Sequence, residues 1–269
     1  SQGRTNYGMN MRGRAIVVLI DGVRLNSSRT DSRQLDSIDP FNIEHIEVIS
    51  GATSLYGGGS TGGLINIVTK KGQQERQVDL ELGGKSGFAN SNDRDERVAA
   101  AVSGGTDHAS GRLSVAYQRF GGWYDGNHDA LILDNTQTGL QHSDRLDVMG
   151  TGTIEIDDNR QLQLVTQYYK SQGDDYGLYL GKNMSAVTGD GKAFTTDGLN
   201  SDRVPGTERH LISLQYSDAD FLGQNLVSQV YYRDESLSFY PFPTLSKGQV
   251  SSFSSSKQDT DQYLSLIHI

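Results

Sequence analysis

The stretch "IDPFNIEHIEVISGATSLYGGGSTGGLINIVTKKG", residues 38–72, decides how this chain folds. Pro40 stands where a short helix could begin, and the alternating isoleucines and valine after it predict a strand that ends at Gly51. Residues 64–71 are apolar and β-branched, which predicts a second strand. The segment that joins the two strands is rich in glycine, so its role decides between an enzyme site and a tightly packed turn.

Three enzyme motifs match this glycine-rich segment when it is taken alone: the dinucleotide motif G-x-G-x-x-G, the serine elbow G-x-S-x-G and a phosphate loop. The first two require a helix directly after the glycines, whereas a predicted strand follows here. The third requires glycine-lysine before serine or threonine, but Gly63 is followed by Leu64. The sequence context argues against all three motifs. A serine hydrolase stays an alternative, and a reaction of Ser60 with a fluorophosphonate probe would support it. The residues concerned are Gly57, Gly58, Gly59, Ser60, Gly62 and Lys70.

The composition excludes several classes of protein. The chain has 269 residues, a net charge of −9 and no cysteine, which excludes a disulfide framework and a catalytic thiol. Its longest apolar run, residues 15–20, is far shorter than the roughly 18 residues of a membrane-spanning helix, but spanning strands remain open. The acidic balance, with no basic tract longer than Lys70-Lys71, predicts no nucleic-acid partner. Because the sequence begins and ends within patterned segments, we expect it to be part of a longer protein.

From about residue 75 onward, apolar and polar residues alternate in long segments. In one of them Leu113, Val115 and Tyr117 share a face, while Arg112 and Ser114 share the other. About ten residues with this period is the length that a tilted strand needs to cross a bilayer. The segments are residues 76–84, 96–105, 111–120, 145–157, 160–172, 209–218 and 225–237.

The connections between these segments alternate between tight and long. Outer-membrane barrels have short turns at one rim and long loops at the other, so we expect the two kinds of connection at opposite ends of the strands. The tight connections are those around Asp107, Asp158 and Ala219, and the opposite rim is expected to carry those containing Trp123, Met184 and Phe242.

Three tyrosines support the same interpretation. Tyr117, Tyr168 and Tyr232 lie on the apolar faces of their segments, each near the end that leads into a long loop. Aromatic residues gather in this way where a membrane-spanning strand meets the lipid–water interface. The alternative is a soluble β-sandwich, but sandwich strands are usually about 5–6 residues long, shorter than the segments here.

A metal site has little support from the sequence. Asp125, Asn127 and Asp129 begin like a calcium loop, but Ala130 replaces the required glycine and Thr136 replaces the bidentate glutamate. The six histidines are scattered, with no pair at a spacing typical of metal ligands. We therefore expect a solvated acidic loop.

Several motifs together resemble one family. "MRGR", "VVLIDGVRLN" and residues 38–72 resemble the plug domain of TonB-dependent outer-membrane receptors. The following alternating segments resemble the start of the receptor barrel, and the resemblance fades at residues 264–269. The matching elements are Arg12-Gly13, Asp21-Gly22-Val23, Ile46–Ile49, Leu55-Tyr56-Gly57, and Gly62-Gly63 with Ile65–Ile67.

The resemblance implies a partial membrane β-barrel, an antiparallel meander of the 22-stranded plugged type, preceded by part of a small α+β plug domain. Residues 1–74 would be the C-terminal part of the plug, and residues 75–269 the N-terminal part of the barrel, about seven strands plus a stub. The glycines would then allow positive φ angles and close backbone approach inside the barrel. Ser60 and Thr61 would be hydrogen-bonding turn residues.

The resemblance also implies a function. The whole receptor would bind a ferric siderophore, of the mixed hydroxamate–carboxylate class, and import it without catalysing a covalent reaction. Its partners would be the siderophore, outer-membrane lipid, and TonB with its inner-membrane energising complex, which contacts a segment absent from this sequence. No cofactor is expected, because the siderophore carries the iron. The alternative is an outer-membrane docking or adhesin barrel without transport.

Candidate site residues follow from the charge of such a ligand. An anionic chelate favours arginines, which bind carboxylates in a bidentate manner, together with an aromatic wall. The arginines lie in a polar plug loop and the aromatic residues in the long loops, although each arginine could instead brace the plug against the barrel. Arg12 and Glu47 occupy motif positions that in the family join plug to barrel. The candidate ligand contacts are Arg24, Arg29, Arg33, Trp123, Tyr124, Tyr176 and Tyr179.

Overall fold

The computed structural model describes residues 10–26, 33, 35–52, 59–128, 131, 140–173, 177–179, 195–200, 204–239, 242–246, 249–254 and 256–269. Within these residues, no helix is both long enough and apolar enough to cross a membrane. The sequence predictions that lie outside the described residues concern Arg29, Leu55, Tyr56, Gly57, Gly58, Asp129, Ala130, Thr136, Tyr176 and Met184.

The N-terminal part forms a small sheet, called the plug sheet below. Strands β2 and β5 pair in parallel at its centre, and β4 pairs antiparallel to β5, as the apolar runs predicted. A single turn of 3-10 helix, η1, begins at Pro40, where a helix was expected. The elements are β1 (Asn10–Met11), β2 (Arg14–Ile20), β3 (Val23–Arg24), η1 (Pro40–Asn42), β4 (Ile43–Ser50) and β5 (Gly63–Thr69).

The glycines before β5 are needed for close backbone approach. A Cβ on Gly62 would lie 2.7 Å from the carbonyl oxygen of Arg14, and one on Gly63 would overlap the carbonyl oxygen of Ile49. Gly63 also has φ +142°, which favours glycine. The Ser60 hydroxyl donates to the carbonyl oxygen of Gly63 at 2.7 Å, which confirms it as a turn residue.

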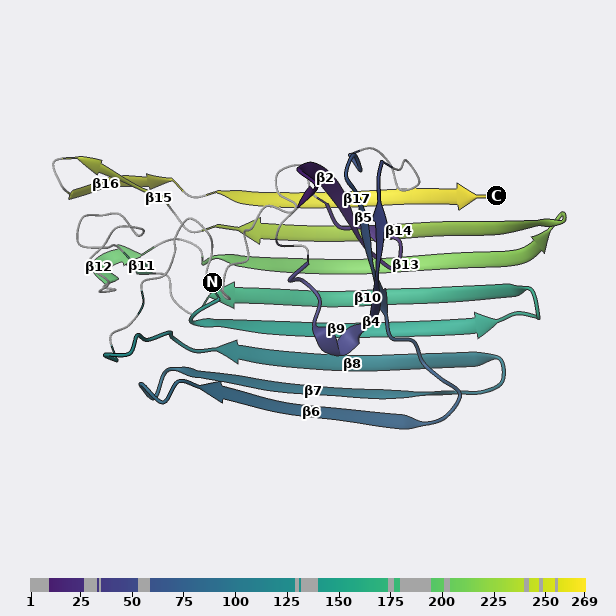
Figure 1. The fold of residues 1–269 in the computed structure, drawn as a ribbon, viewed down its shortest axis with the longest axis horizontal. Coiled ribbons are helices and arrows are strands. Elements are labelled where there is room, and N and C mark those ends of the chain that lie inside the picture. Colours follow the sequence, from purple (N-terminus) through teal and green to yellow (C-terminus); the bar gives the residue numbers. More distant parts are fainter. Residues whose placement is uncertain are drawn as a thin grey trace.

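The rest of the chain forms a long antiparallel sheet, called the wall below. Its order is β17-β14-β13-β10-β9-β8-β7-β6, and two short ribbons, β11–β12 and β15–β16, extend from its connections (Figure 1). The wall strands are β6 (Gln77–Ser86), β7 (Arg94–Gly105), β8 (Ala109–Phe120), β9 (Ser143–Glu155), β10 (Arg160–Gly173), β13 (Gly206–Phe221), β14 (Gln224–Ser238) and β17 (Lys257–His268). The ribbons are β11 (Gly177–Tyr179), β12 (Thr195–Asn200), β15 (Phe242–Ser246) and β16 (Gln249–Ser254).

The count of seven strands plus a stub was wrong, because the last segment forms an eighth strand of the wall. β17 has 12 residues and pairs with β14 from Lys257 opposite Ser238 to His268 opposite Val227. Its first half, "KQDTDQ", is polar on both faces, so it lacks the alternation by which the other strands were found. The backbone pairing with β14, rather than an apolar face, extends the strand to Lys257.

The two rims are arranged as the loop lengths predicted. The tight turns at Asp107 and Asp158, and the turn at Leu222-Gly223 three residues beyond Ala219, close the hairpins at one end of the wall, and the longer connections lie at the other (Figure 1). Ala219 itself lies near the end of β13. Trp123 and Phe242 belong to this second end, called the long-loop rim below.

The outer face of the wall is apolar and exposed, as a lipid-facing surface requires. Near the long-loop rim Tyr117, Tyr168 and Tyr232 lie on this face, which confirms their predicted position. Each tyrosine hydroxyl donates to a carboxylate of the neighbouring strand that lies two residues nearer the rim, with Tyr117 bound to Asp144 at 2.8 Å. Apolar residues of the same face include Val78, Leu80, Leu82, Val98, Val102, Leu113, Val115, Leu164, Ile212, Leu214 and Val230, all at least 39% exposed.

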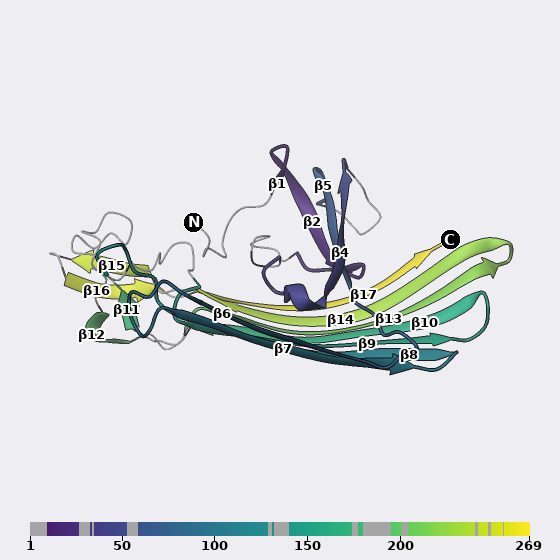
Figure 2. The same cartoon turned by 60° about the horizontal axis from the view of Figure 1, so that its bottom comes forward.

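The plug sheet lies against the inner, concave face of the wall (Figure 2). The apolar residues of β2 and of the turn after it share one core with inward side chains from four wall strands. Plug and wall therefore form one packed unit. The core contains Ile16, Val18, Ile20, Val23, Leu25, Ile38 and Ile67 from the plug, and Met149, Val165, Leu211 and Tyr231 from the wall.

Candidate functional site

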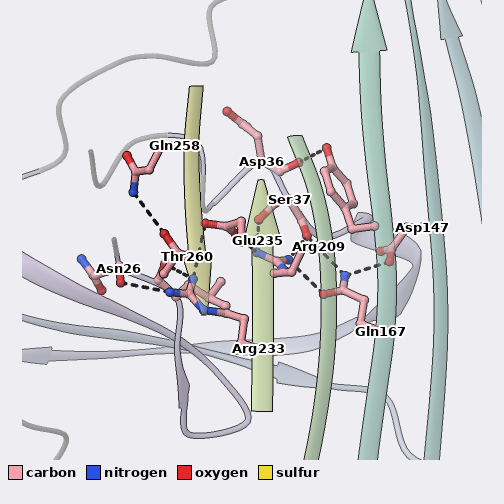
Figure 3. A network of polar contacts seen from close by, with 12 residues as sticks. Asn26, Asp36, Ser37, Asp147, Gln167, Arg209, Arg233, Glu235, Gln258 and Thr260 are labelled. Atoms are coloured by element: carbon pink, nitrogen blue, oxygen red, sulfur yellow. Dashed lines mark hydrogen bonds and ion pairs between the residues drawn. The ribbon is translucent and has the colours of Figure 1, made fainter. Parts of the chain in front are cut away.

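Two buried arginines of the wall hold the plug by its backbone. Arg209 donates to the Ser37 hydroxyl at 2.6 Å and also to the Ser37 carbonyl oxygen. Arg233 donates to the carbonyl oxygens of Leu25, at 2.5 Å, and Asn26, at 3.3 Å. Figure 3 shows both side chains reaching from the wall strands toward these plug segments. The wall thus fixes the plug at two separate points of its chain.

One carboxylate lies between these two arginines. Glu235 is 3.3 Å from Arg209 and 3.5 Å from Arg233, and all three side chains are at most 1% exposed. A single carboxylate cannot neutralise two guanidinium groups. The carbonyl oxygens of the plug therefore accept hydrogen bonds from arginine N–H groups that would otherwise be buried without a partner. The plug therefore supplies hydrogen-bond acceptors that the two wall arginines need.

Asp147 of β9 extends this network toward η1. Its carboxylate accepts hydrogen bonds from the Asp39 backbone at 2.7 Å, from Asn42 at 3.2 Å and from Gln167 at 2.8 Å. Gln167 in turn accepts from Arg209 at 2.9 Å. The polar contacts between plug and wall are thus continuous from β9 to β14.

A bidentate ion pair fixes the same helix to β7. Arg97 contacts both carboxylate oxygens of Asp39, at 2.5 and 2.6 Å, and its Nε lies 2.8 Å from Glu81. Asp39 is also the N-cap of η1, because its carboxylate accepts from the Phe41 backbone at 2.9 Å. One plug carboxylate therefore both orders η1 and attaches it to the wall.

The Asp21-Gly22 turn of the plug joins a second contact. The carboxylate of Asp21 accepts from the Thr69 hydroxyl at 2.6 Å and pairs with Lys71 at 2.9 Å. Its carbonyl oxygen accepts from Gln229 of β14 at 2.9 Å. This turn, which carries the "DG" of the family motif, thereby connects β2 to the end of β5 and to the wall.

Arg33, one of the predicted ligand contacts, lies at the long-loop rim and contacts the wall. Its guanidinium donates to the carbonyl oxygens of Ser238, at 2.9 Å, and Gly206, at 3.3 Å, and lies 4.2 Å from the centre of the Phe239 ring. The side chain is 4% exposed, and loss of water by burial lowers the pKa of Arg33 to about 10. These contacts favour the alternative in which Arg33 braces the plug against the barrel wall.

The other described candidates are distributed along the two parts. Arg24 is half-buried at the end of β3, and Trp123 and Tyr124 are half-buried in the connection after β8. The Trp123 backbone donates to Gln141 at 2.9 Å. Tyr179 ends β11, opposite Thr195 of β12. Contact of these four residues with a ligand stays a prediction.

Arg12 and Glu47 are both exposed on the plug. Arg12 occupies the turn between β1 and β2 with φ +53°. Glu47 of β4 accepts from Asn66 at 2.8 Å and lies 3.5 Å from His45. The hydrogen bond from Asn66 lowers the pKa of Glu47 below its ordinary value. Their predicted ionic contact between plug and barrel stays a prediction.

The acidic loop forms a local turn in the described residues. The Asp125 carboxylate accepts from the Asn127 backbone at 2.8 Å. Within the described residues, no three His, Cys, Asp or Glu side chains lie close enough together to hold a metal ion.

Sequence reasoning missed the residues that join plug and wall. Arg97, Asp147, Arg209, Arg233 and Glu235 all occupy inward positions of strands whose outward positions are apolar. Charges at inward positions of a membrane-spanning strand need partners. The alternation of the strands is visible in the sequence, so these inward charged residues could have been predicted as contacts of the plug.

The comparisons with known proteins agree with this arrangement. Residues 1–64 match the TonB-dependent receptor plug domain. Ferric aerobactin receptors of Klebsiella pneumoniae and Escherichia coli are 76% and 75% identical over 265 residues, 98% of this chain and 36% of each relative. The chain therefore spans about a third of the length of these relatives.

Solved structures show the same fold at low identity. The siderophore receptor PirA of Acinetobacter baumannii matches with a TM-score of 0.66 and 20% identity, over 97% of this chain and 40% of that one. The unliganded ferric citrate transporter FecA matches with a TM-score of 0.63 and 20% identity, over 90% of this chain and 34% of that one. Residues 1–64 thus belong to the plug-domain family of TonB-dependent receptors, and the eight consecutive wall strands that follow have the fold of part of such a receptor's barrel.

Proposed function

We propose that the whole protein binds ferric aerobactin at the cell surface and imports it, with energy supplied by TonB and its inner-membrane complex. The observation that carries this proposal is the 76% identity to a ferric aerobactin receptor over 98% of the chain. The matched region includes the plug, the wall strands and the connections at the long-loop rim, where a ligand from outside would first arrive.

The division of the chain supports the same role. We propose that residues 1–74 are the C-terminal part of the plug and residues 75–269 the first part of the barrel. The chain passes between them beside β7, where the Gly105 backbone donates to the carbonyl oxygen of Gln74 at 3.1 Å, and β6 begins at Gln77. A plug held this firmly to the wall blocks free diffusion, so import requires an energised step.

The iron would be carried by the siderophore and need no protein ligand or cofactor, and no covalent reaction would take place. Outer-membrane lipid would contact the apolar outer face. The alternative is a docking or adhesin barrel that binds without transport. It lacks the support of the relatives, whose names describe receptors and transporters.

The experiment uses the full-length receptor in a strain that has no other siderophore receptor. Uptake of radioactive iron as ferric aerobactin is expected with intact TonB and is expected to stop when TonB is deleted. Surface binding of the same chelate should persist without TonB. Binding without uptake in the TonB-positive strain would support the docking alternative, and absence of binding would contradict the proposed ligand.

A further inference from the structure

The inner face of the wall carries five arginines near the plug, and four of them bind it. Arg97 pairs with Asp39, Arg112 donates to Asn42 at 3.0 Å, and Arg209 and Arg233 bind the backbone as described above. Three of these four each keep one buried nitrogen without a partner, but each has another nitrogen bound to the plug. The fifth, Arg145, differs from all of them.

Arg145 occupies an inward position near the start of β9. The inward positions of this strand are 143, 145, 147, 149 and 151, so Arg145 lies one inward position nearer the long-loop rim than Asp147. Asp147 is already bound to η1, so Arg145 lies at the boundary between the plug contacts and the long-loop rim. An arriving ligand reaches this boundary first.

Among the residues that the structure describes, no carboxylate lies within hydrogen-bonding distance of the Arg145 guanidinium. Its side chain is 9% exposed, and its Nε is buried without a hydrogen-bond partner in the described part of the chain. The guanidinium lies 5.3 Å from the centre of the Phe120 ring, which orients the group without neutralising it. A buried cation without a paired acceptor is costly, so a wall built in this way stabilises an arriving anion.

We propose that Arg145, held against Phe120, is the wall residue that binds a carboxylate of the ferric siderophore. The inference rests on the proposed function and adds a specificity-determining residue to it. The planar guanidinium suits a carboxylate because two parallel N–H donors match its two oxygens. Arg33, one of the three arginines proposed from the sequence, is by contrast bound to backbone carbonyl oxygens of the wall.

The test compares two variants of the full-length receptor, Arg145→Gln and Arg119→Gln. Arg119 is the same residue type at the same end of the neighbouring strand β8, opposite Asp144, but it lies on the exposed outer face. Each purified receptor is titrated with ferric aerobactin and with a derivative in which the carboxylates that do not hold iron are amidated. Its melting temperature is measured in parallel.

Arg145→Gln is expected to raise the Kd for ferric aerobactin at least tenfold, to change the Kd for the amidated derivative less than threefold, and to leave the melting temperature unchanged. Arg119→Gln should change neither Kd. An unchanged Kd for ferric aerobactin, or equal losses for both ligands, would overturn the proposal. A lower melting temperature with unchanged relative affinities would also overturn it, because Arg145 would then be another brace of the plug.

A second variant covers the case in which Arg145→Gln does not assemble. Arg145→Lys keeps the positive charge but lacks the planar pair of N–H donors. The Arg145→Lys receptor should therefore still prefer ferric aerobactin over the amidated derivative, but by a smaller factor than the wild-type receptor. A preference equal to that of the wild type would contradict the proposal. If the wild-type receptor itself binds no ferric aerobactin, the proposed function fails, and the assignment of Arg145 fails with it.

Discussion

Arg97 and Asp39 form a two-point ion pair that joins β7 of the wall to the residue that caps η1 of the plug. The Asp39 carboxylate is 2% exposed and the Arg97 side chain 16% exposed. Water therefore competes little for this pair, which distinguishes it from the surface ion pairs of the chain.

Substitution Asp39→Asn should loosen the attachment of η1. The amide cannot accept two charged hydrogen bonds from Arg97, so the free energy of local opening at residues 36–42 should fall by about 2 kcal/mol. Hydrogen–deuterium exchange of the purified receptor measures this. Glu81→Gln is the matched control, because Glu81 is 49% exposed and its contact with Arg97 should contribute less than about 1 kcal/mol. Equal effects of the two substitutions would contradict this account.

Substitution Glu235→Gln should destabilise the whole unit. It leaves Arg209 and Arg233 buried side by side without their carboxylate, at a cost of about 3–5 kcal/mol. The expected result is a clearly lower melting temperature. Glu208→Gln is the control, because Glu208 is 45% exposed on the outer face of β13. Melting temperatures of both variants equal to that of the wild type would contradict this explanation.

Substitution Gly63→Ala should prevent the plug sheet from closing. The added methyl group would overlap the Ile49 carbonyl oxygen, and φ +142° is unfavourable for alanine, so a cost of about 3 kcal/mol is expected. The measurement is the amount of folded receptor in outer-membrane fractions. Gly126→Ala, where the methyl group would meet nothing within 4 Å, should behave as the wild type. A normal yield for Gly63→Ala would be evidence against the plug geometry.

Substitution Leu164→Arg should impair insertion into the membrane. Leu164 is 40% exposed in the middle of the outer face of β10, where an arginine facing lipid costs about 2–4 kcal/mol. Asn159→Arg, in the short turn before β10, is the control and should insert normally. Heat-modifiable migration in gels reports correct assembly. Normal assembly of Leu164→Arg would show that this face does not meet lipid.

The sequence was sufficient to predict the elements whose cause is local. The alternation of Leu113, Val115 and Tyr117 follows from the lipid on one side of a strand, and Gly62 and Gly63 follow from close backbone approach. Both causes act on neighbouring residues, so the pattern is visible along the chain. The eighth strand was not predicted at its full length, because its extent depends on pairing with β14, which the sequence of β17 does not reveal.

The contacts between plug and wall depend on residues far apart in the sequence. Arg209 and Ser37 are 172 positions apart, and Arg33 and Ser238 are 205 positions apart. Charge and position in a loop made Arg33 a reasonable ligand candidate. The carbonyl oxygens of Gly206 and Ser238 that bind it are brought near by the tertiary structure alone.

Arg209 and Arg233 recognise carbonyl oxygens at Leu25, Asn26 and Ser37, and every amino acid supplies a carbonyl oxygen. A mutation at one of these plug positions can therefore change the side chain and keep the backbone contact with the arginine, whereas the Ser37 hydroxyl and the packed Leu25 side chain have contacts of their own. We expect paired substitutions between these positions to be absent when related sequences are compared, although the groups touch.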